Sequence, residues 1–305
     1  MRYRNALLFV VLAAVWGSAF VAIKAGLAAF PPVLFAAIRY DIAGILVLAY
    51  AAIVTDPLPR SRRDLAAIAV GATLLIAGYH ALLFVGEQST TSAAAAVVVS
   101  LSPVLTTGIA RLALPSERLA RTGLLGVALG FVGAVIVASP DPTQLLASDV
   151  IGNLLIFGAA LSFAAGSVLT RWLDAEVSIE TMEAWSMVGG AVVMHAISVG
   201  IGESPAAITW SPRALAALGY LSLVASAAGF LVYFDLLDRL GPVEINLVSY
   251  VAPIFAAIAG LVVLDEQIAP GTAGGFVVVL LGFVLVKRDA IRATYERHRS
   301  GRSPQ

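Results

Sequence analysis

The sequence predicts an all-α membrane protein of ten transmembrane helices, arranged as two inverted five-helix repeats. The chain of 305 residues is 60% hydrophobic and only 12% charged, with a mean hydropathy of +0.94. A soluble domain carries about 25% charged residues, so this composition indicates a protein embedded in lipid. Its apolar runs are each about 20 residues long, the length that spans a bilayer as a helix. A similar proline-containing apolar segment recurs at residues 97–105 (VVVSLSPVL) and 247–255 (LVSYVAPIF).

Turn-forming residues separate the apolar runs, which favours ten separate spans whose backbones are internally hydrogen-bonded. The first run follows a short basic stretch, Met1 to Asn5, and has no signal-peptide cleavage pattern, so it is interpreted as a retained helix. Later breaks include Phe30-Pro31-Pro32 and Leu240-Gly241-Pro242. The expected helices are residues 6–27, 33–54, 65–86, 92–113, 121–138, 151–170, 181–201, 213–234, 245–264 and 271–287.

The distribution of basic residues predicts the orientation of these helices. Sixteen of the nineteen Lys and Arg residues fall in the N-terminal tail, the even-numbered loops and the C-terminal tail. The odd-numbered loops hold only Arg213, while Lys24 and Arg39 lie within helices. The positive-inside rule therefore predicts a multi-pass protein of the cell membrane with both termini in the cytoplasm. Residues 289–305 are expected to form a solvated basic tail there.

The two halves of the chain resemble each other at an offset of about 150 residues. Leu101-Ser102-Pro103 aligns with Val251-Ala252-Pro253, and the glycines that follow in each half also align. This predicts one repeat over residues 1–139 and a second over 150–288. Because five is odd, the second repeat enters the membrane upside down. Inverted repeats are typical of secondary transporters, whose substrate site lies near the bilayer midplane.

Two long stretches are similar to a known family of transporters. Residues 16–46 (WGSAFVAIKAGLAAFPPVLFAAIRYDIAGIL) resemble the opening of EamA-type permeases of the drug/metabolite transporter superfamily. Residues 237–286 resemble the ninth and tenth helices of those permeases, and the resemblance covers nearly the whole chain. It implies a ten-helix carrier, often an exporter, for small metabolites or amphiphilic compounds. Residues 84–91 (FVGEQSTT) depart from the family pattern by being more charged.

The repeated proline segments are expected to meet at a central substrate cavity. Pro103 and Pro253 would kink their helices near mid-membrane and free a carbonyl for a ligand, or serve packing alone. Polar residues around these kinks would line the cavity, and aromatic residues of the first and third helices would add its walls. The expected substrate-binding residues are Trp16, Tyr79, His80, Ser100, Ser102, Asn246, Ser249 and Tyr250.

Charged and titratable residues inside the spans have two interpretations each. Lys24 and Arg39 could gate the path or bind substrate, or their long stems could snorkel to the interface. His80 could relay protons, since a histidine titrates near neutral pH, or it could be a hydrogen-bonded packing residue. Glu117 and Glu266 each precede the last helix of a repeat, where a carboxylate would cap the helix. Gating or kinking positions are Lys24, Arg39, Pro103 and Pro253.

The function that these features favour is secondary transport by alternating access, with protons or an exchanged solute as the energy source. The alternative is an intramembrane lipid or prenyl transferase that holds Mg²⁺ with Asp235 and Asp238. A purely structural membrane protein has no positive feature in its support. The expected partners are a small-molecule substrate and the lipid bilayer, with a homodimer left open. We expect no enzyme activity, cofactor, metal or nucleic acid.

Overall fold

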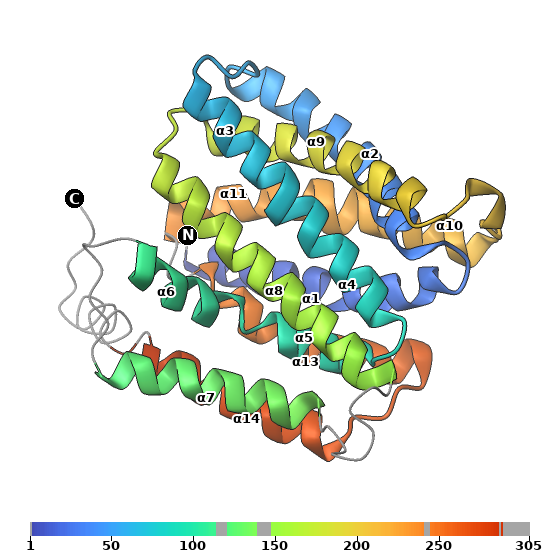
Figure 1. The fold of residues 1–305 in the computed structure, drawn as a ribbon, viewed down its shortest axis with the longest axis vertical. Coiled ribbons are helices and arrows are strands. Elements are labelled where there is room, and N and C mark those ends of the chain that lie inside the picture. The colour runs from blue at the N-terminus through green and yellow to red at the C-terminus, as the bar shows by residue number, and fades with distance from the viewer. Residues whose placement is uncertain (1, 114–120, 139–147, 241–244, 287, 289–305) are drawn as a thin grey trace.

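The protein is a bundle of long helices in the computed structural model, which describes residues 2–113, 121–138, 148–240, 245–286 and 288. Within these ranges there is no strand. Figure 1 shows that α1 begins and α14 ends at the same end of the bundle. The helices are α1 (Arg2–Leu27), α2 (Pro32–Val54), α3 (Arg62–Val70), η1 (Gly71–Gly78), α4 (Tyr79–Glu87), α5 (Ser92–Val99), α6 (Ser102–Ala113), α7 (Arg121–Ala138), α8 (Ser148–Leu173), α9 (Ile179–Gly200), η2 (Pro205–Ala207), α10 (Pro212–Gly219), η3 (Tyr220–Ala228), α11 (Gly229–Leu240), α13 (Val248–Leu264) and α14 (Pro270–Val286).

The length and surface of these helices are those of a membrane protein. Among the described residues, seven helical segments are long and apolar enough to cross a bilayer, and three further apolar helices are shorter. The outward faces carry exposed apolar side chains such as Leu124, Val192 and Val262. A water-facing surface would not expose so many large apolar side chains, whereas lipid solvates them. Each of the ten predicted ranges overlaps a helical segment of the structure.

Side chains from the opposite half of the chain cap the start of α2. Pro31 cannot supply a side-chain cap, and the carboxylate of Glu203, which follows α9, accepts hydrogen bonds instead from the backbone N–H groups of Val33 at 3.0 Å and Leu34 at 2.7 Å. These amides would otherwise be unsatisfied at the helix N-terminus. The cap therefore joins α2 to α9 at the end of the bundle opposite the N terminus.

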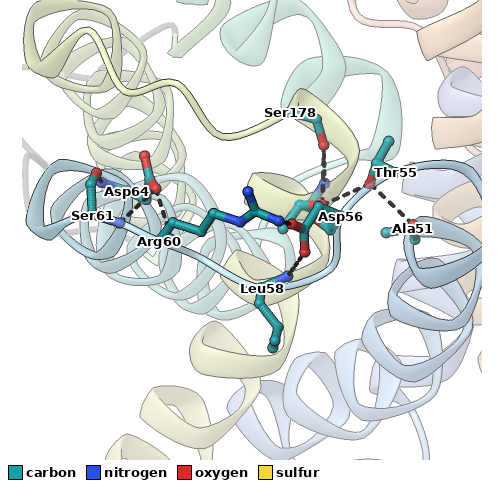
Figure 2. Close-up of polar contacts among 9 residues, drawn as sticks. Ala51, Thr55, Asp56, Leu58, Arg60, Ser61, Asp64 and Ser178 are labelled. Atoms are coloured by element: carbon teal, nitrogen blue, oxygen red, sulfur yellow. Dashed lines mark hydrogen bonds and ion pairs between the residues drawn. The ribbon is translucent and has the colours of Figure 1, made fainter.

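The other end of α2 is also fastened to α9, through the loop that leads into α3 (Figure 2). Thr181 Oγ1 donates to the backbone oxygen of Asp56 at 2.8 Å and lies 2.9 Å from Thr55 Oγ1. Trp185 Nε1 donates to the backbone oxygen of Pro57 at 2.7 Å. The same loop ends in a capping box at Ser61, which starts α3. The α2–α9 pair is thus tied at both of its ends.

The two proline segments adopt different structures, which corrects the prediction of matching kinks. The fourth span breaks at Ser100 and Leu101, and Pro103 lies in the first turn of the new helix α6. Pro253 lies inside the continuous helix α13. Near the break, Ser100 Oγ donates to Val97 O at 2.6 Å and Ser102 Oγ to Val99 O at 2.7 Å. These serines occupy carbonyls that the prediction left free for a ligand.

Glu266 caps a helix other than the expected one. Its carboxylate accepts hydrogen bonds from Ser92 N at 3.0 Å and 3.2 Å and from Ser92 Oγ at 3.3 Å. It therefore caps α5 of the first half rather than α14, which follows it in sequence. The predictions for Glu117 and for the tail 289–305 lie outside the described residues.

Glycines allow α7 and α14 to pack with their backbones in contact, side by side at one edge of the bundle (Figure 1). A Cβ atom on Gly133 would lie 2.9 Å from Gly275 O, and a Cβ atom on Gly282 would lie 2.6 Å from Gly126 O. Small residues at such crossings let membrane helices approach closely. The glycines that align between the two halves of the sequence therefore lie at this helix contact.

Two adjacent glycines of α14 provide a matched test of this packing. Gly275→Ala is expected to lower stability by about 1–3 kcal/mol, because its Cβ would meet Gly133 O at 2.7 Å and Val137 N at 3.0 Å. Gly274→Ala has no atom within 4 Å of the new Cβ and should be neutral or slightly stabilising. Thermal unfolding of both variants in the same detergent measures the difference. Equal unfolding temperatures would contradict the packing described here.

Candidate functional site

A cavity of about 490 Å³ lies within the bundle and is lined by residues from both halves of the chain. This volume is within the usual range for small-molecule sites. Helices α1, α2, η1, α4 and α6 contribute from the first half, and α8, α9, η3, α11, α13 and α14 from the second. The cavity therefore lies where the two halves meet, and any relative movement of the halves would change its shape.

The cavity extends from the middle of the bundle toward the end where α1 begins. On α6 it is lined by Thr106, Thr107 and Ala110, near the end of that helix, and on α9 by Glu183, near its start. Arg171 lines it near the end of α8. All of these positions lie at the same end of their helices as the loop between α2 and α3.

Aromatic rings form one wall of the cavity. The rings of Trp16, Phe230 and Tyr233 lie within 5.5–6.3 Å of one another, centroid to centroid. The Trp16 indole N–H donates to Ala225 O at 3.1 Å, inside the π-helical segment η3, which fixes the orientation of the ring. A wall of rings with a few fixed polar groups is typical of sites for small amphiphilic molecules.

Arg39 lies inside the bundle and lines the cavity, so the snorkelling interpretation is wrong. Its side chain is only 6% exposed, and Nε donates to Ser226 Oγ at 2.9 Å. The guanidinium carbon lies 5.0 Å from the centroid of the Tyr40 ring. A guanidinium held beside a ring and a hydroxyl keeps further N–H donors for a ligand in the cavity.

His80 lines the cavity with both ring nitrogens engaged. Nδ1 lies 2.8 Å from Ile76 O, and because a carbonyl only accepts, Nδ1 donates this bond. Nε2 lies 2.7 Å from the hydroxyl of Tyr40 and therefore accepts from it. Both hydrogen bonds fit the neutral imidazole, and they support the packing interpretation of His80 over the proton relay.

A cluster of aromatic side chains packs together at the far end of the bundle. The rings of Phe30 and Phe35 stack at 4.6 Å, Phe84 meets Phe35 at 5.4 Å, and Trp210 meets Phe30 at 5.5 Å. Phe30, Phe35 and Phe84 are buried. We call these four residues the aromatic plug. It lies where α1 ends and where α2 begins, beyond the cavity.

Most of the residues expected from sequence are brought together, but four are not. The cavity is lined by Trp16, Arg39, Tyr79, His80, Ser102, Pro103, Asn246 and Ser249. Ser100 is fully buried in the packing of the α5–α6 break, and Tyr250 packs on Phe283 at 4.0 Å. Pro253 lies in a separate, smaller apolar pocket between α5, α13 and α14. Lys24 binds backbone carbonyls at the end of α4.

The sequence alone did not single out several cavity residues. Glu183, near the start of α9, is one of them and lines the cavity. Arg171, Thr106 and Thr107 also line it. Their common sequence signal is a polar residue within about two turns of either end of an apolar helix, which an interfacial residue shares. A cavity residue can be told from an interfacial one only when the structure shows that several helix ends converge on one cavity.

Of the two aspartates of the transferase alternative, one forms ion pairs and the other is exposed. Asp235 accepts two hydrogen bonds from Arg239, at 2.6 Å and 2.8 Å, and lies 3.8 Å from Arg4. Asp238 is exposed, and the described residues include no group of three or more His, Cys, Asp or Glu side chains that could hold a metal. Nothing in the structure supports a Mg²⁺–diphosphate site.

Comparison with known proteins identifies the family. A model of the EamA-like transporter family matches residues 4–139 and again residues 150–288. The chain belongs to the EamA-like transporter family. Like other members of this family, it is a membrane permease by descent, and its helices and interior cavity agree with that class.

Named relatives of this EamA-like protein are also transporters. The uncharacterized inner membrane transporter YedA of Escherichia coli (strain K12) is 31% identical over 264 residues, which are 85% of this chain and 84% of YedA. The uncharacterized transporter YoaV of Bacillus subtilis (strain 168) is 25% identical over 271 residues, covering 89% and 92% of the two chains. A crystal structure with 21% sequence identity shares the fold, with a TM-score of 0.66 over 96% of this chain and 99% of the other.

Proposed function

We propose that this EamA-like permease is a secondary transporter that exports or exchanges small amphiphilic metabolites by alternating access. The observation that carries the proposal is the cavity between the two halves, which lies toward one end of the bundle while the aromatic plug closes the other. One half-open cavity between two movable units is what alternating access requires. With both termini in the cytoplasm, as the positive-inside rule predicts, the cavity faces inward.

The packing of the helices supports an inverted repeat of five plus five, with ten spans in all. Helices α1 and α8 both have 26 residues, and the π-helical segments η1 and η3 occupy the third span of each half. Contacts also follow a two-fold pattern: α2 packs on α9, α7 on α14, α1 on α13, and α8 on α5 and α6. The double match of one family model, to residues 4–139 and 150–288, agrees with repeats over 1–139 and 150–288.

The chemistry of the cavity favours a small molecule with both apolar and polar groups. The rings of Trp16, Phe230 and Tyr233 would cover an apolar part, while Arg39 and Glu183 offer charges of both signs. A polyanion would find Glu183 unfavourable, and a purely apolar ligand would leave the terminal N–H groups of the buried Arg39 without a polar partner. Protons or an exchanged solute remain the predicted energy source, and a homodimer remains a prediction.

Single cysteines test the proposed access, because the chain has no native cysteine. Ser102→Cys and Ser249→Cys line the cavity and should react with a membrane-impermeant thiol reagent from the inner side of proteoliposomes, and in part from the outer side. Ser100→Cys is the matched control, since Ser100 lies two residues away and is fully buried. Compounds that protect position 249 from labelling are candidate substrates for uptake assays. Labelling from only one side under all conditions would contradict alternating access.

A further inference from the structure

A buried carboxyl group at the closed end of the bundle has no hydrogen-bond partner. Glu87 is the last residue of α4, its side chain is 0% exposed, and neither of its carboxyl oxygens has a partner among the described residues. Burying an ionised carboxylate without a partner is so costly that such a group normally becomes neutral. Glu87 lies outside the cavity described above, so substrate contacts do not explain it.

The nearby ammonium group of Lys24 does not bind this carboxyl group, because its protons are used elsewhere. Lys24 Nζ donates to the backbone oxygens of Glu87 at 2.8 Å, Gln88 at 3.0 Å and Thr90 at 2.8 Å. An ammonium group has three protons, and three carbonyls take them. Lys24 thus caps the C-terminal end of α4, where a cation is favoured by the helix dipole.

A second carboxylate, Glu266, lies close enough to act on Glu87, and the two carboxyl groups differ in their surroundings. Glu266 accepts hydrogen bonds from Ser92 at the N-terminus of α5, where the helix dipole favours an anion. Glu87 has no hydrogen bond and lies at a helix C-terminus, where the dipole disfavours an anion. Glu87 lacks both of these anion-stabilising features and is therefore suited to the protonated form.

The other elements around Glu87 add no anion-binding group. The charges that act on it are Lys24 of α1, Arg39 of α2 and Glu266 after α13. Helix α5 (SAAAAVVV) has no titratable residue, and α8 presents Gly152 and Ile156 to the last turn of α4. On the same span as Glu87, His80 is held by Tyr40 and Ile76.

We propose that Glu87 is a proton-binding site of the closed end, a role that rests on the proposed transport function. The bound species is a proton rather than a metal ion, because Lys24 already occupies the surrounding carbonyls. With the aromatic plug closed, the protonated carboxyl is sealed in the bundle. Opening of that end would expose Glu87 to outer water, where the carboxyl ionises and the proton leaves to solution. Acidic outer pH would then favour the closed end, and alkaline outer pH the open one.

Chemical labelling detects the proton without any assay of transport. Dicyclohexylcarbodiimide is membrane-soluble and modifies protonated carboxyl groups in apolar surroundings. Peptide mass spectrometry of the wild-type protein should find the adduct on Glu87 at pH 6 at a level at least tenfold above that on Glu176, an exposed carboxylate. Labelling of Glu87 no stronger than labelling of Glu176 would overturn the proposal.

The pH dependence of stability supplies a second readout. If folded protein holds a proton that unfolded protein has released, the unfolding constant of the wild type rises by up to tenfold per pH unit between pH 5 and 8. Glu87→Gln keeps the shape of the neutral group and should remove this slope, while Glu176→Gln should retain it. Parallel pH profiles for the wild type and Glu87→Gln would contradict a buried proton.

Transport separates this proposal from the proposed function. In proteoliposomes, Glu87→Gln should abolish the dependence of transport on outer pH while Glu176→Gln keeps it. The protein could show the carbodiimide adduct on Glu87 and the pH dependence of unfolding, yet transport no tested solute. That result would leave Glu87 as a proton site and refute the transport function. Transport whose pH dependence survives in Glu87→Gln, with no adduct, would refute the proton site and leave transport intact.

Discussion

Replacing Arg39 by methionine is expected to lower transport by roughly 10- to 100-fold while the bundle stays folded. The guanidinium lines the cavity and, among the described residues, has a single hydrogen bond, to Ser226, so most of its donors are available to a ligand. Hydrogen bonds to a charged group contribute about 1.5–3 kcal/mol, which sets this range. Arg39→Lys keeps the charge but loses the planar guanidinium group. Its transport rate should therefore lie between those of the wild type and Arg39→Met. Initial rates in proteoliposomes at equal protein content measure the effect.

The matched control for Arg39 is Arg213→Met. Arg213 is exposed near the start of α10 and lies outside the cavity, so its loss should leave the transport rate unchanged. Thermal unfolding of each variant distinguishes lost binding from lost structure. A folded Arg39→Met variant that transports at the wild-type rate would show that the cavity is not the route of the substrate.

Phe35→Ala is expected to open the aromatic plug and to destabilise the protein by about 3–5 kcal/mol, the usual cost of truncating a buried phenylalanine. Phe35 is fully buried, stacks on Phe30 at 4.6 Å and meets Phe84 at 5.4 Å. Its removal takes away the central ring of the plug. In the Ser102→Cys background, labelling from the outer side should therefore become faster, and thermal unfolding should occur at a lower temperature.

Phe131→Ala is the control for this experiment, because Phe131 is 44% exposed on the outer face of α7. It should change neither the labelling rate from the outer side nor, by more than a small amount, the unfolding temperature. If Phe35→Ala were destabilised but showed no faster labelling from outside, the plug would be a packing feature only and not the closure of the outer path.

The helices could be predicted from sequence because hydrophobic runs and proline or glycine breaks are local signals. Glu183 and the capping role of Glu266 could not, because both depend on which helices of the opposite half lie nearby. The two proline segments show the same limit. Pro103 and Pro253 have similar neighbours in sequence, yet one starts a new helix and the other lies within a continuous one. Serine hydroxyls that bond to carbonyls beside the break stabilise the first arrangement, and α13 has no equivalent pair of bonds among those described.

Arg39 shows how a residue can be found by sequence and still be misplaced. An arginine one turn or two inside an apolar helix fits both a snorkelling and an inward orientation. Ser226, which binds it, is 187 residues away in sequence and belongs to η3. No local pattern connects the two residues, so only the packing of α2 against η3 decides the orientation.

The cap on α2 bears on how the protein is made. Translation reaches Glu203 170 residues after Val33, so at about 5–20 residues per second α2 enters the membrane roughly 10–30 s before its capping carboxylate exists. A shorter delay, over 125 and 128 residues, precedes the synthesis of Thr181 and Trp185, which donate hydrogen bonds to the loop after α2. During that interval the newly inserted first half has amide groups that its own residues do not satisfy. The first half therefore inserts before its hydrogen-bond partners in the second half exist. These bonds can form only once α9 and Glu203 have been synthesised.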